Sequence, residues 1–135
     1  MPKFSDQSED RLLSCDERLQ KLFNTVIEHW DCTVLDGHRG KERQEEAFRT
    51  GMSKLQFPKS PHNVFPSLAV DVAPYPIKWA DRERFIYFAG KVMAVAKLMG
   101  IPLRFGGDWS MDDHMADETF RDLVHYEIIT EGKKK

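Results

Sequence analysis

The chain has 135 residues, the usual length of one domain, and its 41% hydrophobic and 31% charged residues are typical of a globular protein. A formal net charge of −2 gives no support to nucleic-acid binding, which usually requires a strongly basic face. The sequence has no apolar run near the ~18 residues that cross a bilayer and no signal-peptide pattern at its N-terminus. We therefore expect one monomeric domain over residues 1–135, without membrane insertion and with flexible tails at about residues 1–10 and 131–135.

A first helix is predicted after residues 14–17, whose Ser-x-x-Glu spacing is typical of a capping box. Apolar side chains then recur every three or four positions, which indicates one buried helix face: Leu19, Leu22, Phe23, Val26, Ile27 and Trp30. Cys15 and Cys32 form no CxxC pattern, so we expect two buried, reduced thiols rather than a disulfide.

A strand and a second helix are predicted next. The β-branched run at 32–35 is typical of a strand and is stopped by an Asp-Gly pair. Residues 41–49 predict a helix that ends at Gly51. We expect this helix to direct Ala47 and Phe48 inward.

The middle of the chain predicts a loop, a strand and the longest helix. Residues 52–66 contain three prolines and read as a loop, while residues 68–73 form a short apolar strand. Residues 79–99 predict a helix that Gly100 terminates. Its predicted core stripe consists of Phe85, Phe88, Ala89, Val92, Ala96 and Met99.

The C-terminal part predicts two further strands, at residues 102–105 and 126–129. An acidic loop at 108–117 and a short helix through Phe120 separate them. Helices therefore precede and separate short strands that must pair over long sequence distances. This order indicates an α+β fold with a small, mainly antiparallel sheet and flanking helices.

Two histidines and one aspartate stand out as candidate metal ligands. His62 lies in the proline-rich loop, Asp71 interrupts an apolar strand between two alanines that share its face, and His125 lies near the C-terminus. Burying an unpaired carboxylate is costly, so Asp71 requires a cation or a helix N-terminus beside it. Two imidazoles and a carboxylate can bind zinc through three ligands and leave the fourth position for water.

The order His62, Asp71, Asp122 and His125 resembles the zinc-binding pattern of the M15-type peptidoglycan peptidases. In that family a Ser-x-His element precedes an Ala-x-Asp element, and the late histidine follows an acidic residue by three positions. The resemblance is strongest to the bacteriophage L-alanyl-D-glutamate endopeptidases (endolysins), in a group shared with D-alanyl-D-alanine carboxypeptidases.

Further segments extend the resemblance over roughly residues 12–129. Residues 36–39 (Asp-Gly-His-Arg) resemble the family's Gly-x-Arg strand end, and residues 44–53 resemble its following helix and loop. Residues 104–109 resemble the segment before the last ligand. The linker after His62 is longer than in many relatives and is similar in this respect to the phage branch.

The resemblance implies a Hedgehog/DD-peptidase-like fold and one zinc ion per chain, held by His62, Asp71 and His125. It also implies that Asp122 is the general base and that Arg39 anchors the substrate and stabilises the oxyanion. A carboxylate can accept the proton of an attacking water, and a guanidinium suits both a substrate carboxylate and a developing oxyanion.

Three other residues each leave two alternatives open. Glu127 shares a strand face with His125, so it is either a rival general base to Asp122 or an acceptor for the imidazole N–H. Ser60 either hydrogen-bonds the substrate or caps its loop. His114 either joins neighbouring aspartates in a second metal site or belongs to a flexible acidic loop, and we favour the loop.

The function that the resemblance implies is zinc-dependent hydrolysis of the peptidoglycan stem peptide, at the L-alanyl-D-glutamate bond, which causes lysis of the cell wall. Such a protein is made in the host cytoplasm and reaches the wall through a membrane hole formed by another protein. The alternatives are a D-alanyl-D-alanine carboxypeptidase or dipeptidase on the same scaffold and a non-catalytic zinc-binding module. A complete set of ligands and base favours an enzyme, because a binding module has no need of the base.

Overall fold

The computed structural model describes residues 2–109, 111 and 122–130. Its elements follow one another as α1 (Asp6–Leu13), α2 (Glu17–His29), β1 (Cys32–Asp36), α3 (Lys41–Arg49), the 3-10 helix η1 (Pro61–Asn63), β2 (Ala69–Pro74), α4 (Arg82–Leu98), β3 (Leu103–Phe105) and β4 (His125–Ile128). Most of the predicted acidic loop, including His114, and the short helix before Phe120 lie outside the described residues.

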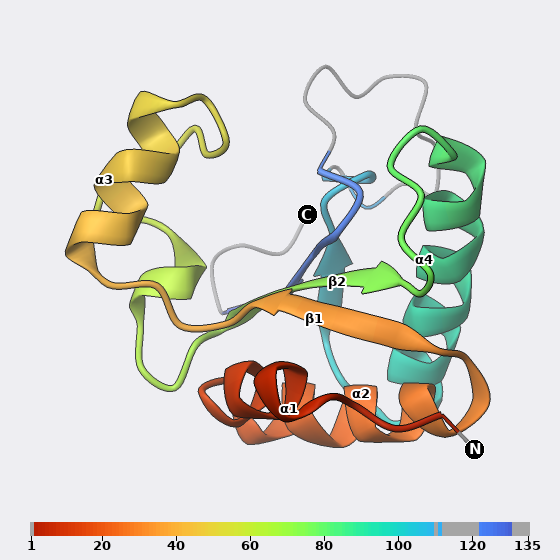
Figure 1. The fold of residues 1–135 in the computed structure, drawn as a ribbon. Helices are drawn as coiled ribbons and strands as arrows, with labels where there is room; N and C mark the ends of the chain where they lie inside the picture. The colour runs from red at the N-terminus through yellow and green to blue at the C-terminus, as the bar shows by residue number, and fades with distance from the viewer. Residues whose placement is uncertain (1, 110, 112–121, 131–135) are drawn as a thin grey trace.

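The four strands form one sheet in the order β1-β2-β4-β3, and every neighbouring pair is antiparallel. The sheet therefore brings the middle of the chain, β2, between an N-terminal strand and the C-terminal strand β4. Helices α1 and α2 lie side by side along one side of the sheet, and α4 packs against β2, β3 and α2 (Figure 1). The predicted α+β class with a small antiparallel sheet is confirmed.

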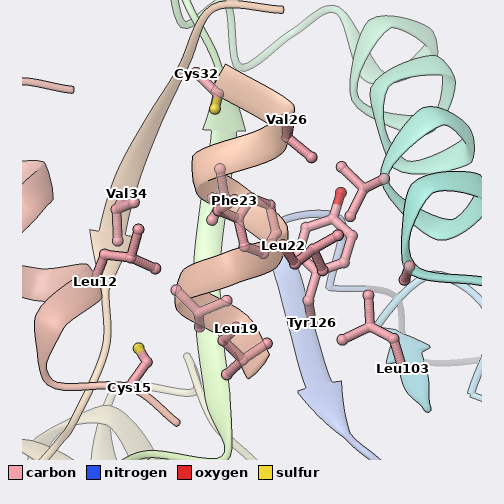
Figure 2. Packing of buried hydrophobic residues seen from close by; sticks show 14 of the residues in the cluster. Leu12, Cys15, Leu19, Leu22, Phe23, Val26, Cys32, Val34, Leu103 and Tyr126 are labelled. Atoms are coloured by element: carbon pink, nitrogen blue, oxygen red, sulfur yellow. The ribbon is translucent and has the colours of Figure 1, made fainter. Parts of the chain in front are cut away.

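The hydrophobic core lies between α2, α4 and the sheet (Figure 2). Its centre is Tyr126 of β4, which is 0% exposed. Phe23 meets the Tyr126 ring edge-on at a centroid distance of 5.5 Å and an angle of 66°, and Phe105 stacks on the same ring at 5.5 Å and 28°. The residue next to His125 thus packs strand β4 into the core, so the backbone that carries this histidine is held rigidly.

Helix α3 and the loop after it project from one end of the sheet (Figure 1). The helix has the predicted bounds, is followed by Gly51 at a φ of 84°, and buries Gln44 and Ala47. The prediction that Phe48 points inward is wrong, because α3 contacts the rest of the protein along one narrow side and leaves Phe48 40% exposed.

The N-terminal segment is helical from Asp6, so the expectation of a flexible tail over residues 1–10 is wrong for its second half. Ser5 caps α1 by accepting a hydrogen bond from the backbone N–H of Ser8 at 3.1 Å. The buried Ser8 hydroxyl accepts a hydrogen bond from the backbone N–H of Val34 at 3.0 Å. Polar contacts to β1 therefore order this segment, and hydrophobic periodicity does not reveal such contacts.

The N-terminal cap of α2 differs from the predicted Ser-x-x-Glu box. Asp16 rather than Ser14 is the capping residue, and its carboxylate accepts a hydrogen bond from the backbone N–H of Arg18 at 2.8 Å. The Ser14 hydroxyl instead donates to the Arg11 carbonyl at 2.6 Å and accepts from the His38 backbone N–H at 2.9 Å. Ser14 thereby ties the end of α1 to the loop that follows β1.

Helix α4 begins at Arg82 rather than at Trp79, because the Asp81 carboxylate caps it by accepting from the backbone N–H of Arg84 at 3.2 Å. The predicted core stripe of this helix is buried except for Met99, which follows the last turn and is 39% exposed. Within the described part of the chain, no helix is both long and apolar enough to cross a membrane.

Cys15 and Cys32 are both buried and free, which confirms the predicted reduced thiols. They belong to the hydrophobic core, and Figure 2 shows them well apart, with Leu12 and Val34 between them in this view. Burial raises the pKa of each thiol to about 12, so both side chains stay neutral at physiological pH.

Candidate active site

The three predicted ligands, His62, Asp71 and His125, come together from η1, β2 and β4. His62 Nε2 and His125 Nδ1 lie 3.3 and 3.2 Å from the same carboxylate oxygen, Asp71 Oδ1. One ligand atom from each residue lies within 4.8 Å of the others, so the cluster can hold a metal ion. Two imidazoles and one carboxylate without a thiolate are typical of catalytic rather than structural zinc sites.

The sheet places two members of this cluster. Asp71 and His125 are direct partners in the antiparallel β2-β4 ladder, and paired residues project their side chains to the same face. Burial raises the pKa of Asp71, but its interactions with the imidazoles of His62 and His125 outweigh burial and hold the pKa well below its usual range. The carboxylate is therefore ionised and available as a ligand.

The third member, His62, is placed by the short helix η1 and its capping box. The Ser60 hydroxyl accepts a hydrogen bond from the His62 backbone N–H at 3.2 Å, and the Asn63 side-chain oxygen accepts from the Ser60 backbone N–H at 3.0 Å. Ser60 therefore caps its loop, one of the two roles considered for it. Ser60 is 4% exposed and is among the residues that line the cavity over the cluster.

The hydrogen bonds of His62 determine which of its nitrogens can bind a metal. Nδ1 lies 2.7 Å from the Gly37 carbonyl oxygen, and because a carbonyl only accepts, Nδ1 carries the proton. Nε2 is then the lone-pair nitrogen of the neutral ring. It is buried, and among the described residues it has no hydrogen-bond partner. A buried acceptor without a partner is costly, and a cation beside Asp71 would satisfy it, so the residues present fit a bound metal ion.

Gly37, whose carbonyl accepts the hydrogen bond from His62, lies very close to the end of α1. A Cβ atom at position 37 would collide with the Arg11 carbonyl oxygen and the Ser14 hydroxyl. Only glycine therefore fits where the loop after β1 passes the end of α1. This explains in physical terms why the Gly-x-Arg segment requires its glycine.

His125 is oriented from the other side by Glu127, the residue two positions along β4. His125 Nε2 lies 2.8 Å from Glu127 Oε1, so Nε2 carries a proton and Nδ1 faces Asp71. Burial lowers the pKa of His125, but the hydrogen bonds to Asp71 and Glu127 outweigh it and raise the pKa to about 10. Burial raises the pKa of Glu127, but its hydrogen bond and charge interaction with His125, together with Arg104, lower it below the usual range.

Asp122, the predicted general base, borders the same cavity as the three ligands. A turn fixes it: its backbone N–H donates to the Gly106 carbonyl at 2.9 Å, and its carbonyl accepts from the His125 backbone N–H at 3.2 Å. A Cβ atom at Gly106 would collide with the Asp122 carbonyl, so this approach also requires glycine. Burial, followed by the negative charge of Asp71, raises the pKa of Asp122, which suits a group that takes up a proton.

Arg39, the predicted anchoring arginine, is 8% exposed and lies beside the cluster. Its guanidinium donates from Nε to Asp36 Oδ2 at 3.1 Å and from Nη1 to Gln44 Oε1 at 2.9 Å, and its Nη2 lies 3.6 Å from Asp71 Oδ2. The backbone N–H of Arg39 donates to the His62 carbonyl at 2.7 Å. Arg39 therefore connects β1, α3 and η1, and its Nη2 edge faces the metal cluster.

Sequence reasoning missed Gln44, which is 0% exposed and has both ends of its amide occupied. Its oxygen accepts from Arg39 Nη1 at 2.9 Å and from Asn63 Nδ2 at 3.2 Å. Its nitrogen donates to Ser53 Oγ at 3.0 Å and to the Leu55 carbonyl at 2.6 Å. The available signal was its position three residues before Ala47, on the same buried helix face.

A cavity of about 390 Å³ opens over the cluster. Its lining includes the loop Met52–Leu55 after α3, and also Arg104, Trp109 and Glu127. The Trp109 ring lies 5.3 Å from the His125 ring, centroid to centroid. The cavity therefore gives a substrate access to the metal cluster, and Asp122 is among the residues that line it.

Comparison with known proteins agrees with this arrangement. A family model described as phage L-alanyl-D-glutamate peptidase matches residues 1–129. The chain is 31% identical over 135 residues to the L-alanyl-D-glutamate peptidase of Escherichia phage T5, covering 94% of this chain and 98% of that protein. The crystal structure of Serratia marcescens L-Ala D-Glu endopeptidase ChiX has the same fold, with a TM-score of 0.74, 24% identity and coverage of 94% of this chain and 90% of that one. The chain is therefore a peptidase that belongs to the phage L-alanyl-D-glutamate peptidase family.

Proposed function

We propose that this protein hydrolyses the L-alanyl-D-glutamate bond of peptidoglycan stem peptides with one zinc ion per chain. The observation that carries the proposal is the buried Nε2 of His62, which has no hydrogen-bond partner among the described residues and faces Asp71 Oδ1 at 3.3 Å. His62, Asp71 and His125 would hold the ion through Nε2, a carboxylate oxygen and Nδ1. When bound, zinc would polarise the scissile carbonyl and lower the pKa of water toward ~7.

In this proposal Asp122 is the general base. Its carboxylate removes a proton from the attacking water as the water oxygen bonds to the scissile carbonyl carbon, and it returns a proton to the amine nitrogen as the carbon–nitrogen bond breaks. Glu127 suits this role less, because its two carboxylate oxygens already accept from His125 and Arg104 at 2.8 Å each. The low pKa of Glu127 also disfavours proton uptake, whereas the pKa of Asp122 is raised.

Arg39 and Ser60 have supporting roles in the proposal. The Nη2 edge of Arg39 faces the cluster, where it would stabilise negative charge that develops on the carbonyl oxygen. Since Asp36 and Gln44 occupy its other donors, Arg39 offers the substrate one edge rather than a free guanidinium. Ser60 holds the His62 loop and is among the residues that line the cavity.

The biological role that we propose is lysis of the bacterial wall at the end of phage infection. The enzyme would accumulate in the host cytoplasm and reach peptidoglycan through a membrane hole made by another protein. The family membership and the similarity to the T5 peptidase support this role.

Defined muropeptides test the proposal directly. The purified protein should release products whose masses correspond to cleavage between L-alanine and D-glutamate. A chelator should abolish the cleavage, and added zinc should restore it. Release of a terminal D-alanine instead would favour the carboxypeptidase alternative, and cleavage that survives complete metal removal would contradict the zinc proposal.

A further inference from the structure

We infer that Arg104 is a positioning residue of the active site, which acts on His125 through Glu127. The Arg104 guanidinium holds the Glu127 carboxylate, and that carboxylate holds the His125 ring with Nδ1 directed at Asp71. The inference rests on the proposed function in one respect, since the orientation of Nδ1 matters for zinc binding. The hydrogen-bonded arrangement itself does not depend on a metal.

The register of the sheet creates this arrangement. Arg104 of β3 is the direct cross-strand partner of Glu127 in β4, and His125 of β4 is the direct partner of Asp71 in β2. Residues two apart on a strand project to the same face, so Glu127 and His125 stand side by side. The four side chains therefore form a line across three neighbouring strands, and a register shift of one residue would disperse them.

The hydrogen bonds along this line have only one possible direction. Arg104 Nη2 lies 2.8 Å from Glu127 Oε2, and a guanidinium can only donate. His125 Nε2 lies 2.8 Å from the other carboxylate oxygen, Oε1, so the ring must donate there. With both oxygens engaged, Glu127 cannot rotate to release one partner without breaking the other bond. Arg104 thus restricts the ring orientation of His125 without touching it.

Arg104 is itself held in place. Its guanidinium carbon lies 5.2 Å from the centre of the Trp109 ring, and its Nη1 donates to the Trp109 carbonyl at 3.5 Å. The Glu127 side chain is 5% exposed and that of Arg104 is 21% exposed, so the pair is largely shielded from water. Removing Arg104 would leave a buried carboxylate with His125 as its remaining charged partner among the described residues, and the carboxylate would then be free to turn toward water.

Arg104→Met tests the inference, because methionine keeps much of the side-chain volume and removes every donor. Arg104→Lys retains the charge but offers no planar fork, so it is the conservative variant. Glu127→Gln removes the acceptor charge from the same line. Arg18→Met is the matched control, since it removes an arginine–carboxylate pair, with Asp16 at 2.9 Å, that is far more exposed and lies in the cap of α2.

Two readouts are needed. The first is the zinc dissociation constant, measured by competition with a chromophoric chelator. Loss of a residue that orients a metal ligand typically weakens metal binding by ~10–100-fold, and we expect this range for Arg104→Met, with partial recovery in Arg104→Lys. The double variant with Glu127→Gln should bind zinc no more weakly than Glu127→Gln alone, because both changes break one line of contacts.

The second readout is the imidazole Hε2 proton of His125 in nuclear magnetic resonance spectra of the metal-free protein. A buried Nε2–H that donates to Glu127 should give a protected downfield resonance, which Arg104→Met should lose and Arg18→Met should keep. If Arg104→Met keeps both the resonance and wild-type zinc affinity, or raises only KM, Arg104 is not a positioning residue. If the wild-type protein binds no zinc, the proposed function fails, and the Hε2 resonance alone decides the inference.

Discussion

Asp71 and His125 face each other across the β2-β4 ladder, with the carboxylate Oδ1 3.2 Å from the imidazole Nδ1. The antiparallel pairing of β2 with β4 brings these two residues together although they are far apart in the sequence. Tyr126, the next residue of β4, is packed in the core. The sheet therefore fixes two of the three candidate ligands, and the capped helix η1 fixes the third, His62. A site on regular elements keeps its ligands in fixed directions, which a catalytic metal requires.

His62→Ala should abolish peptidase activity while the protein remains folded. His62 contributes a metal ligand through Nε2, and its other nitrogen makes one hydrogen bond, to the Gly37 carbonyl. Activity on muropeptides and the circular dichroism spectrum should be compared with those of His29→Ala, which changes a histidine at the end of α2. Wild-type turnover by His62→Ala would remove this residue from the site.

Asp122→Asn should retain zinc and lower kcat by ~100- to 10,000-fold, because an amide cannot take up the proton of the attacking water. Glu127→Gln should reduce kcat less and should chiefly weaken zinc binding, since Glu127 supports His125 through its hydrogen bond at 2.8 Å. Steady-state kinetics on zinc-loaded protein measures both effects. If Glu127→Gln abolished turnover and Asp122→Asn had almost no effect, Glu127 would be the general base and the assignment of Asp122 would be wrong.

The sequence predicted the elements and the ligands of this molecule better than its polar contacts. Apolar periodicity located α2 and the core stripe of α4, and the family resemblance identified His62, Asp71 and His125, which the structure brings together. Helix periodicity places Gln44 on the buried face of α3 with Ala47, but neither source reveals its four hydrogen bonds to separate segments.

Segment ends show the same limit of prediction. The helix at Asp6 depends on Ser8 bonding to β1, and the start of α4 depends on Asp81. Single side-chain hydrogen bonds decide such boundaries, whereas periodicity averages over many residues. The exposed Phe48 has a similar cause, since a helix pattern cannot tell how much of a projecting helix the rest of the chain will cover.

Gln44→Met should destabilise the protein by about 1–3 kcal/mol for each buried partner left unsatisfied, and it should raise KM. The residue joins Arg39 to the Ser53–Leu55 wall of the cavity, so its loss should loosen that wall more than the core. Urea unfolding and muropeptide kinetics provide the measurements. Gln20→Met is a suitable control, because Gln20 makes one partly buried bond, to the Cys15 carbonyl at 2.9 Å. If the two variants lost the same stability and changed KM equally, Gln44 would not have the special role of joining Arg39 to the cavity lining.

Stability should decline as the pH rises above about 9. The folded protein holds the pKa of Cys15 and Cys32 at about 12 by burial, whereas the thiols of the unfolded chain ionise near the ordinary pKa of 9.0. Between these values the unfolded state binds fewer protons than the folded state, so raising the pH favours unfolding. Urea unfolding at pH 8 and pH 10 should show this loss, and Cys15→Ala/Cys32→Ala should reduce the difference. If the double variant lost as much stability between pH 8 and pH 10 as the wild-type protein, groups other than the two thiols would cause the loss.

The most direct test of the metal centre is the zinc content of the wild-type protein and of Asp71→Ala after zinc loading and gel filtration. Asp71 lies between the two imidazoles, 3.3 Å from His62 Nε2 and 3.2 Å from His125 Nδ1, and its loss removes the one carboxylate that both rings face. Elemental analysis should find about one zinc per wild-type chain and almost none in folded Asp71→Ala. A wild-type protein without zinc, or an Asp71→Ala variant with a full equivalent, would contradict the assignment of His62, Asp71 and His125 as the zinc site.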